Sequence, residues 1–112
     1  RDPELRLIAQ ARLARVLSEQ GKHDDALKLL DVTQAGAFGP LYHDARGDVL
    51  AAKGDAAGAR QAYDSALAAT TTAEAAEGID RAFIELKRDA LQATAKTAAA
   101  APAPAPAAGS AP

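Results

Sequence analysis

Residues 41–63 read LYHDARGDVLAAKGDAAGARQAY, and they match residues 8–30, IAQARLARVLSEQGKHDDALKLL, at an offset of 33 residues. Four positions are identical in the two copies, and around them small residues match small ones and large apolar residues match large ones. The identities are Val16 with Val49, Leu17 with Leu50, Gly21 with Gly54 and Ala26 with Ala59. The two copies therefore share one pattern of apolar, small and turn residues.

A repeat of this length, with paired small and large positions, is typical of helical hairpins of the tetratricopeptide type. Ala14 and Gly47 each precede the turn glycine by seven residues, and Ala26 and Ala59 each follow it by five. We expect these four small side chains where the two helices of a hairpin approach closely. The sequence predicts an all-α fold of two tetratricopeptide-like hairpins plus a C-terminal capping helix.

In the first hairpin, one helix is predicted to start at residues 2–4, where an aspartate, a proline and a glutamate favour a helix N-terminus. Gly21 ends it, because glycine adopts the left-handed conformation without strain. Asp24 or Asp25 is predicted to cap a second helix, whose apolar side extends as far as Thr33.

In the second hairpin, a loop over residues 34–39 precedes a helix that Pro40 opens and Gly54 ends. Asp55 is then predicted to cap the partner helix, which runs through Leu67. The second hairpin should therefore have the same order of helix, glycine turn and capped helix as the first.

A capping helix is predicted to begin near Thr71 and Thr72, with a later start as the alternative because Gly78 weakens its first part. Its expected apolar stripe consists of Ile79, Phe83, Leu86 and Ala90. The charged residues expected to face away are Asp80, Arg81, Glu85, Arg88 and Asp89.

From about Lys96 the composition changes to alternating alanine and proline, which cannot bury enough apolar area to offset the cost of ordering. We expect two parts: a repeat domain over residues 1–95, the C-terminal portion of a longer array, and a disordered Ala/Pro-rich tail over residues 96–112. Leu5, Leu7 and Ile8 favour an earlier repeat, since they give the first helix more apolar surface than one partner covers.

The overall composition argues against several classes of protein. A net charge of −2 provides no basic surface for nucleic acid, and the absence of cysteine excludes disulfides and thiolate metal sites. The uncharged stretch 97–112 contains four prolines and no large apolar residue, so it does not match a membrane span.

The histidines give little support for chemistry. His23, Asp24 and Asp25 form the one cluster that resembles a metal or acid–base site, but a turn followed by a helix N-cap explains them better. His43 is interpreted as an ordinary, partly exposed helix residue, with modulation of a surface near neutral pH as the alternative. We find no catalytic triad or phosphate loop, and we predict a non-enzymatic protein without cofactor or metal.

The remaining possibility is a protein-binding surface. In arrays of this type the first helix of each hairpin lines the concave side, so the repeat register selects six residues. They are Ala11, Arg15, Ser18, Asp44, Asp48 and Ala51. The alternative is that Arg15 and the two aspartates only neutralise one another.

The strings DARGDVL (residues 44–50), KGD (53–55) and GARQAY (58–63), with LARVLSEQGKHDDALKLLD (13–31) before them, resemble the C-terminal part of the YfgM-type family of ancillary SecYEG translocon subunits. Ile79-Asp80-Arg81 and Leu86-Lys87, with Leu91, resemble that family's closing helix. The resemblance covers about residues 2–92. Phe38 stands where the family often has tryptophan.

This resemblance implies a bacterial inner-membrane protein with one membrane helix and a periplasmic array of tetratricopeptide-like repeats. The implied partners are the SecYEG translocon and the periplasmic chaperone PpiD, and any membrane attachment would be through an anchor outside this sequence. The alternative is a generic tetratricopeptide scaffold in another envelope or cytosolic complex.

Overall fold

The computed structural model describes residues 2–70 and 79–100, and within these ranges it contains five α-helices, two short 3-10 helices and no strand. The all-α prediction is confirmed. The α-helices are α1 (Asp2–Glu19), α2 (His23–Leu29), α3 (Gly39–Lys53), α4 (Ala56–Ala69) and α6 (Arg81–Ala100), and the 3-10 helices are η1 (Val32–Gln34) and η2 (Gly36–Phe38).

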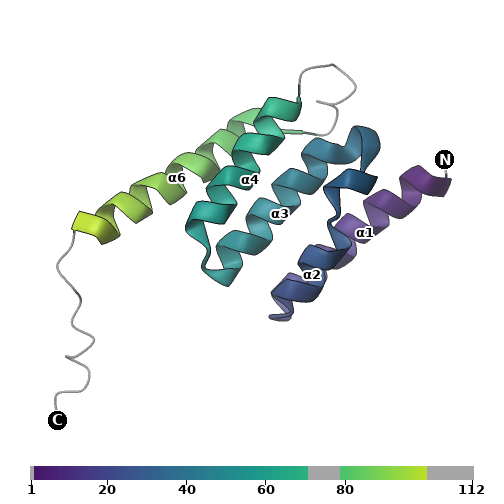
Figure 1. Cartoon of the computed structure of the whole chain (residues 1–112), viewed down its shortest axis with the longest axis horizontal. Helices are drawn as coiled ribbons and strands as arrows, with labels where there is room; N and C mark the ends of the chain where they lie inside the picture. The colour runs from purple at the N-terminus through teal and green to yellow at the C-terminus, as the bar shows by residue number, and fades with distance from the viewer. Residues whose placement is uncertain (1, 71–78, 101–112) are drawn as a thin grey trace, which may run out of the picture.

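The helices pack as consecutive neighbours (Figure 1). α1 pairs with α2 and α3 pairs with α4, while α3 also contacts both helices of the first hairpin. α6 packs against α4 and so covers the second hairpin. This arrangement confirms two stacked hairpins followed by a capping helix.

The turns of the two hairpins have the same geometry. Gly21 and Gly54 have φ angles of 84° and 98°, in the left-handed region that glycine tolerates. In each turn the residue after the glycine donates its amide to a carbonyl near the end of the preceding helix. The Lys22 amide donates to the Leu17 carbonyl at 2.8 Å, and the Asp55 amide donates to the Leu50 carbonyl at 2.9 Å. This pairing satisfies carbonyls that the helix end leaves unpaired.

The N-cap predictions are half right. Asp55 caps α4 as predicted, and its carboxylate accepts a hydrogen bond from the Gly58 amide at 2.9 Å. For α2 the prediction is wrong, because Lys22 is the N-cap residue and makes no side-chain cap bond. Asp24 and Asp25 lie in the first turn, where their charge still favours the positive end of the helix dipole.

α2 is also shorter than predicted, with 7 residues against 14 in α4. Leu30 leaves the helix, and the Arg46 guanidinium donates to its carbonyl at 3.2 Å. Thr33 therefore lies in η1, where the Asp31 carboxylate accepts from its amide at 3.0 Å. The predicted loop over residues 34–39 contains η2, and Pro40 occupies the first turn of α3 as expected.

The core consists of two clusters. The first lies between the hairpins and contains Ala11, Ala14, Ala26, Leu30, Ala35, Tyr42, Ala45 and Val49. The second lies beneath α6 and contains Ala59, Tyr63, Ala66, Leu67 and Ile84. The four predicted small positions are all buried, and a Cβ added to Gly47 would lie 2.9 Å from the Cζ atom of Tyr63.

The predicted apolar stripe of the capping segment is right in part. Ile79 packs against the second core cluster, but Phe83 and Leu86 are 52% and 64% exposed, and Ile84 is buried at 1% in their place. Arg81, which was expected to face away, donates to the Leu67 carbonyl at 2.8 Å.

The described part of α6 runs from Arg81 to Ala100. Among the described residues the helix begins at Arg81, and Asp80 accepts from the Phe83 amide at 3.1 Å. The predicted start near Thr71 and Thr72 lies outside the described residues. α6 continues to Ala100, beyond the boundary expected at residue 96, and residues 101–112 lie outside the described part. No described helix combines the length and apolar character needed to cross a membrane.

Candidate protein-binding surface

The six predicted surface residues occupy equivalent places on α1 and α3, but they differ in accessibility. Ala11 is only 4% exposed and belongs to the core, so it cannot line an open groove in this structure. Ser18 lies within hydrogen-bond distance of the His23 ring, with Oγ 2.9 Å from Nδ1. Ala51 is half-buried and packs against the second core cluster.

The other three residues meet a fourth from α6. Arg15 forms an ion pair with Asp48 and approaches Asp44 at 3.7 Å. The Lys87 ammonium lies 2.9 Å from a carboxylate oxygen of each aspartate. We refer to Arg15, Asp44, Asp48 and Lys87 as the charged cluster, which connects α1, α3 and α6.

The charged cluster is electrically balanced, with two cations and two carboxylates whose side chains are 15–40% exposed. Arg15 contacts both aspartates in the structure. The cluster therefore joins three successive helices, and it presents no excess charge of either sign.

Aromatic rings enclose one side of the charged cluster. The Tyr63 hydroxyl donates to Asp48 at 2.5 Å, and the Lys87 ammonium lies 5.0 Å from the Tyr63 ring centre and 4.6 Å from that of Phe83. Cations at these distances are attracted to the ring faces. Lys87 is therefore held by carboxylates and rings together.

Burial and hydrogen bonding act in opposite directions on the acidity of Asp48. Burial raises its pKa, but hydrogen bonds from Tyr63, Lys87 and Arg15 outweigh this and leave the pKa below its usual value. The pKa of Tyr63 is raised by burial, by its hydrogen bond to Asp48 and by the charge of that carboxylate. Asp48 thus stays ionised and Tyr63 stays protonated near neutral pH.

The sequence analysis missed the part played by Lys87. Arg15 and Asp48 are 33 residues apart, whereas Lys87 follows Asp48 by 39, so the repeat offset does not find it. The one available signal was the alternation of charge from helix to helix. Arg15 on α1 is a cation and Asp48 on α3 is an anion, so a cation on α6 would continue the alternation.

The motif residues at the turns have identifiable structural tasks. Arg46 donates to the carbonyls at the end of α2, and Gly47 admits the Tyr63 ring. A Cβ on Gly58 would lie 2.8 Å from the Asp55 carboxylate carbon, so glycine there leaves room for the cap. These residues explain how the second hairpin closes.

The side chains of His23 and Asp24 contact different partners and do not form a common site. Asp24 pairs with the Lys53 ammonium at 2.8 Å, while the His23 ring faces Ser18. Within the described residues, no group of three or more His, Cys, Asp or Glu side chains is arranged to hold a metal ion. His43 is half-buried on α3, and its pKa is lowered by burial and then by the charge of Arg46.

Exposed large apolar side chains are found on the outer helices. The described residues place them on α1 and α6, at exposures of 46–65%. They are Leu5, Leu13, Val16, Phe83 and Leu86. α6 thus contributes apolar surface immediately beside the charged cluster, since Phe83 contacts Lys87.

Two stacked antiparallel hairpins with glycine turns and a covering helix define a helical repeat protein of the tetratricopeptide class. The family described as tetratricopeptide repeat-like domain matches residues 1–93, and the chain belongs to this family.

Two relatives share the name "Ancillary SecYEG translocon subunit". The one from Escherichia coli (strain K12) is 35% identical over 71 residues, which are 63% of this chain and 34% of the relative. The one from Neisseria gonorrhoeae (strain ATCC 700825 / FA 1090) is 32% identical over 92 residues, 82% of this chain and 42% of the relative. The chain thus spans less than half the length of each relative.

These matches confirm the resemblance to the YfgM-type family. No solved structure matches the chain significantly. Together, the repeat fold and the translocon-subunit relatives support a protein-interaction role.

Proposed function

We propose that this chain is a non-enzymatic interaction module of an ancillary SecYEG translocon subunit. It acts on the periplasmic side of the bacterial inner membrane and links the translocon to periplasmic chaperones such as PpiD. The observation that carries this proposal is the match to two relatives named "Ancillary SecYEG translocon subunit". The charged cluster supports an interaction role, because it joins α1, α3 and α6 into one face. A face built from successive helices is the binding surface typical of repeat proteins.

The contact face in this proposal comprises Arg15, Ser18, Asp44, Asp48 and Ala51, together with the neighbouring apolar residues of α6. Because the charged cluster is already balanced, it contributes orientation and specificity more than affinity. Phe83 is an exposed large side chain that contacts the cluster, and with the exposed Leu86 of the same helix it supplies the apolar area that drives association. Ala11 is left out because it is buried.

Affinity purification tests this proposal. The protein is tagged, expressed from its own gene and purified from membranes in mild detergent, and its partners are identified by mass spectrometry. We expect the translocon subunits and a periplasmic chaperone to co-purify. Recovery of an unrelated envelope or cytosolic complex without translocon subunits would contradict the proposal and favour the generic scaffold.

A further inference from the structure

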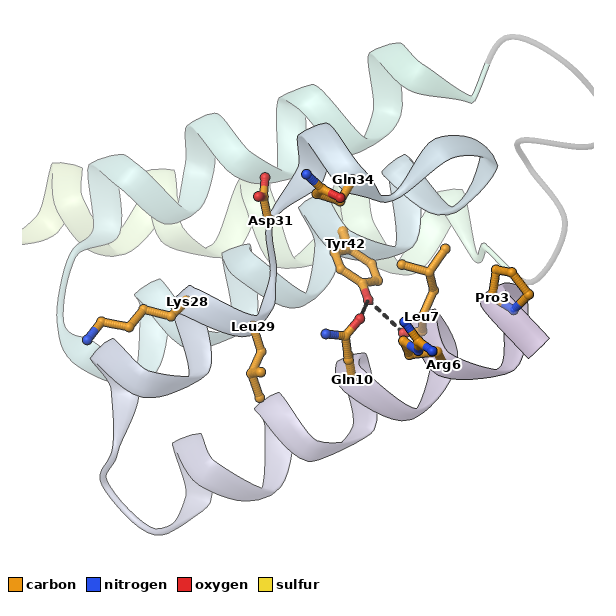
Figure 2. Close-up of a pocket in the computed structure, with 9 residues that line it drawn as sticks. All are labelled: Pro3, Arg6, Leu7, Gln10, Lys28, Leu29, Asp31, Gln34 and Tyr42. Atoms are coloured by element: carbon orange, nitrogen blue, oxygen red, sulfur yellow. Dashed lines mark hydrogen bonds between the residues drawn. The ribbon is translucent and has the colours of Figure 1, made fainter. Parts of the chain in front are cut away.

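A pocket of about 450 Å³ lies between the N-terminal half of α1, the end of α2 and the start of α3 (Figure 2). It shares no residue with the charged cluster. Its volume falls in the range of small-ligand sites, so it accommodates a few residues of a partner. The lining residues are Pro3, Arg6, Leu7, Gln10, Lys28, Leu29, Asp31, Gln34 and Tyr42.

The pocket exists because α2 is short. α4 continues for 14 residues along α3, whereas α2 ends after 7 and the chain turns away into η1. The N-terminal half of α1 is therefore left without the last two turns of a partner helix. Figure 2 shows the α1 residues along one side of the pocket and the α2–η1 residues along the other.

Tyr42 provides a fixed wall between these two sides. Its side chain is 1% exposed, and its hydroxyl donates to the Leu7 carbonyl at 2.7 Å. The Gln10 side-chain oxygen lies 3.4 Å from the same hydroxyl. This anchoring keeps the pocket preformed, which lowers the entropy lost when a ligand binds.

The two cations of the lining are available to a ligand. Arg6 and Lys28 are exposed and form no hydrogen bond or ion pair within the described part of the chain. Asp31 is the one carboxylate in the lining, and it accepts from the Thr33 amide at 3.0 Å and hydroxyl at 2.6 Å. With two cations against one anion, the lining carries a net positive charge in a chain whose own net charge is −2.

The arrangement of charges along the pocket is complementary to a particular sequence pattern. In Figure 2, Lys28 projects outward at one end and Arg6 lies toward the other, with Leu29 and Gln10 between them and Leu7 beside Arg6. The glutamine side chains in the lining provide donors and acceptors for a peptide backbone.

We propose that this pocket binds an extended peptide segment in which apolar side chains are flanked by acidic residues. The apolar side chains pack against the half-buried Leu7 and Leu29, and the flanking carboxylates pair with Arg6 and Lys28. This site is additional to the α1–α3–α6 face and does not depend on the identity of the translocon partner.

NMR titration of the 15N-labelled 112-residue chain tests the proposal. The probes are acetyl-Glu-Leu-Leu-Glu-amide and its neutral counterpart, acetyl-Gln-Leu-Leu-Gln-amide. We expect the acidic peptide to shift amide signals of the lining residues and to bind about fivefold more tightly at low salt. Raising the salt concentration should remove this difference, because exposed ion pairs are screened.

Variants locate the site. Arg6→Gln and Lys28→Gln should each reduce binding of the acidic peptide toward that of the neutral one. Arg12→Gln, on the same helix but outside the lining, should leave it unchanged. Equal affinities for the two peptides, signal shifts away from the lining, or an equal loss in Arg12→Gln would overturn the proposal. Co-purification with the translocon can succeed or fail independently of these outcomes.

Discussion

Closure of the second hairpin depends on the contact between Gly47 and Tyr63. The glycine leaves space for the tyrosine ring, and the ring in turn places its hydroxyl on Asp48. A small residue at position 47 was predictable from the repeat pattern, because Ala14 occupies the equivalent place. The ring that fills the space was not, since the pattern only matched Tyr63 in size with Leu30.

Gly47→Ala should therefore destabilise the fold by about 1–3 kcal/mol, because the added methyl group overlaps the ring. The matched control is Gly47→Ala in a Tyr63→Leu background, which removes the ring that the added Cβ would overlap. In that background the substitution should be neutral or slightly stabilising. Urea unfolding in both backgrounds measures the difference, and equal effects would show that the Gly47–Tyr63 contact is misassigned.

Asp48 should contribute to the pH dependence of stability. Its pKa is lower in the folded chain than the unfolded value of about 3.9, so its contribution is present above that pH and is lost as the pH falls below it. Free energies of unfolding measured between pH 2.5 and pH 7 should fall less steeply at acid pH in Asp48→Asn than in the wild type. Identical slopes would count against the charged cluster.

At the scale of elements, local signals were sufficient for α1, α3 and α4. Glycine turns, a first-turn proline and a capping aspartate lie next to the helices that they limit, so they can be read directly from the sequence. The shortening of α2 could not be read from the sequence in this way. Arg46 donates to the carbonyls at the end of α2, and this arginine belongs to the next hairpin.

The orientation of α6 has a similar explanation. Its sequence carries two possible apolar faces, and the more obvious one, with Phe83 and Leu86, is exposed. The buried face packs Ile84 against residues of α4 and carries ion pairs to residues far away in the chain, such as Lys87 with Asp44 and Arg88 with Asp64. Periodicity within one helix contains no information about such partners.

The two helix N-termini provide a direct test at this scale. Asp55→Ala should destabilise the fold by about 1 kcal/mol, because it removes the cap bond to Gly58. Asp25→Ala should change stability by less than about 0.5 kcal/mol, because Asp25 lies in the first turn of α2 and makes no cap bond. Thermal unfolding compares the two, and a larger loss in Asp25→Ala would restore the original capping assignment.

At the scale of the whole molecule, the hairpins form a scaffold whose exposed apolar groups are concentrated on its outer helices. The charged cluster connects α1, α3 and α6, and Phe83, which contacts Lys87, stays accessible beside it. The proposed binding surface was thus predictable in its α1 and α3 parts, where the repeat register applies. Its α6 part required the structure, because Lys87 falls outside that register.

The claim that the α1–α3–α6 face is the working surface is tested most directly by site-specific photo-crosslinking in cells. A photoreactive amino acid replaces Phe83, which contacts Lys87 of the charged cluster, or Gln61, which is exposed on α4. We expect crosslinks to translocon subunits or a periplasmic chaperone from position 83 and none from position 61. Crosslinks to these proteins from position 61 alone would contradict the account.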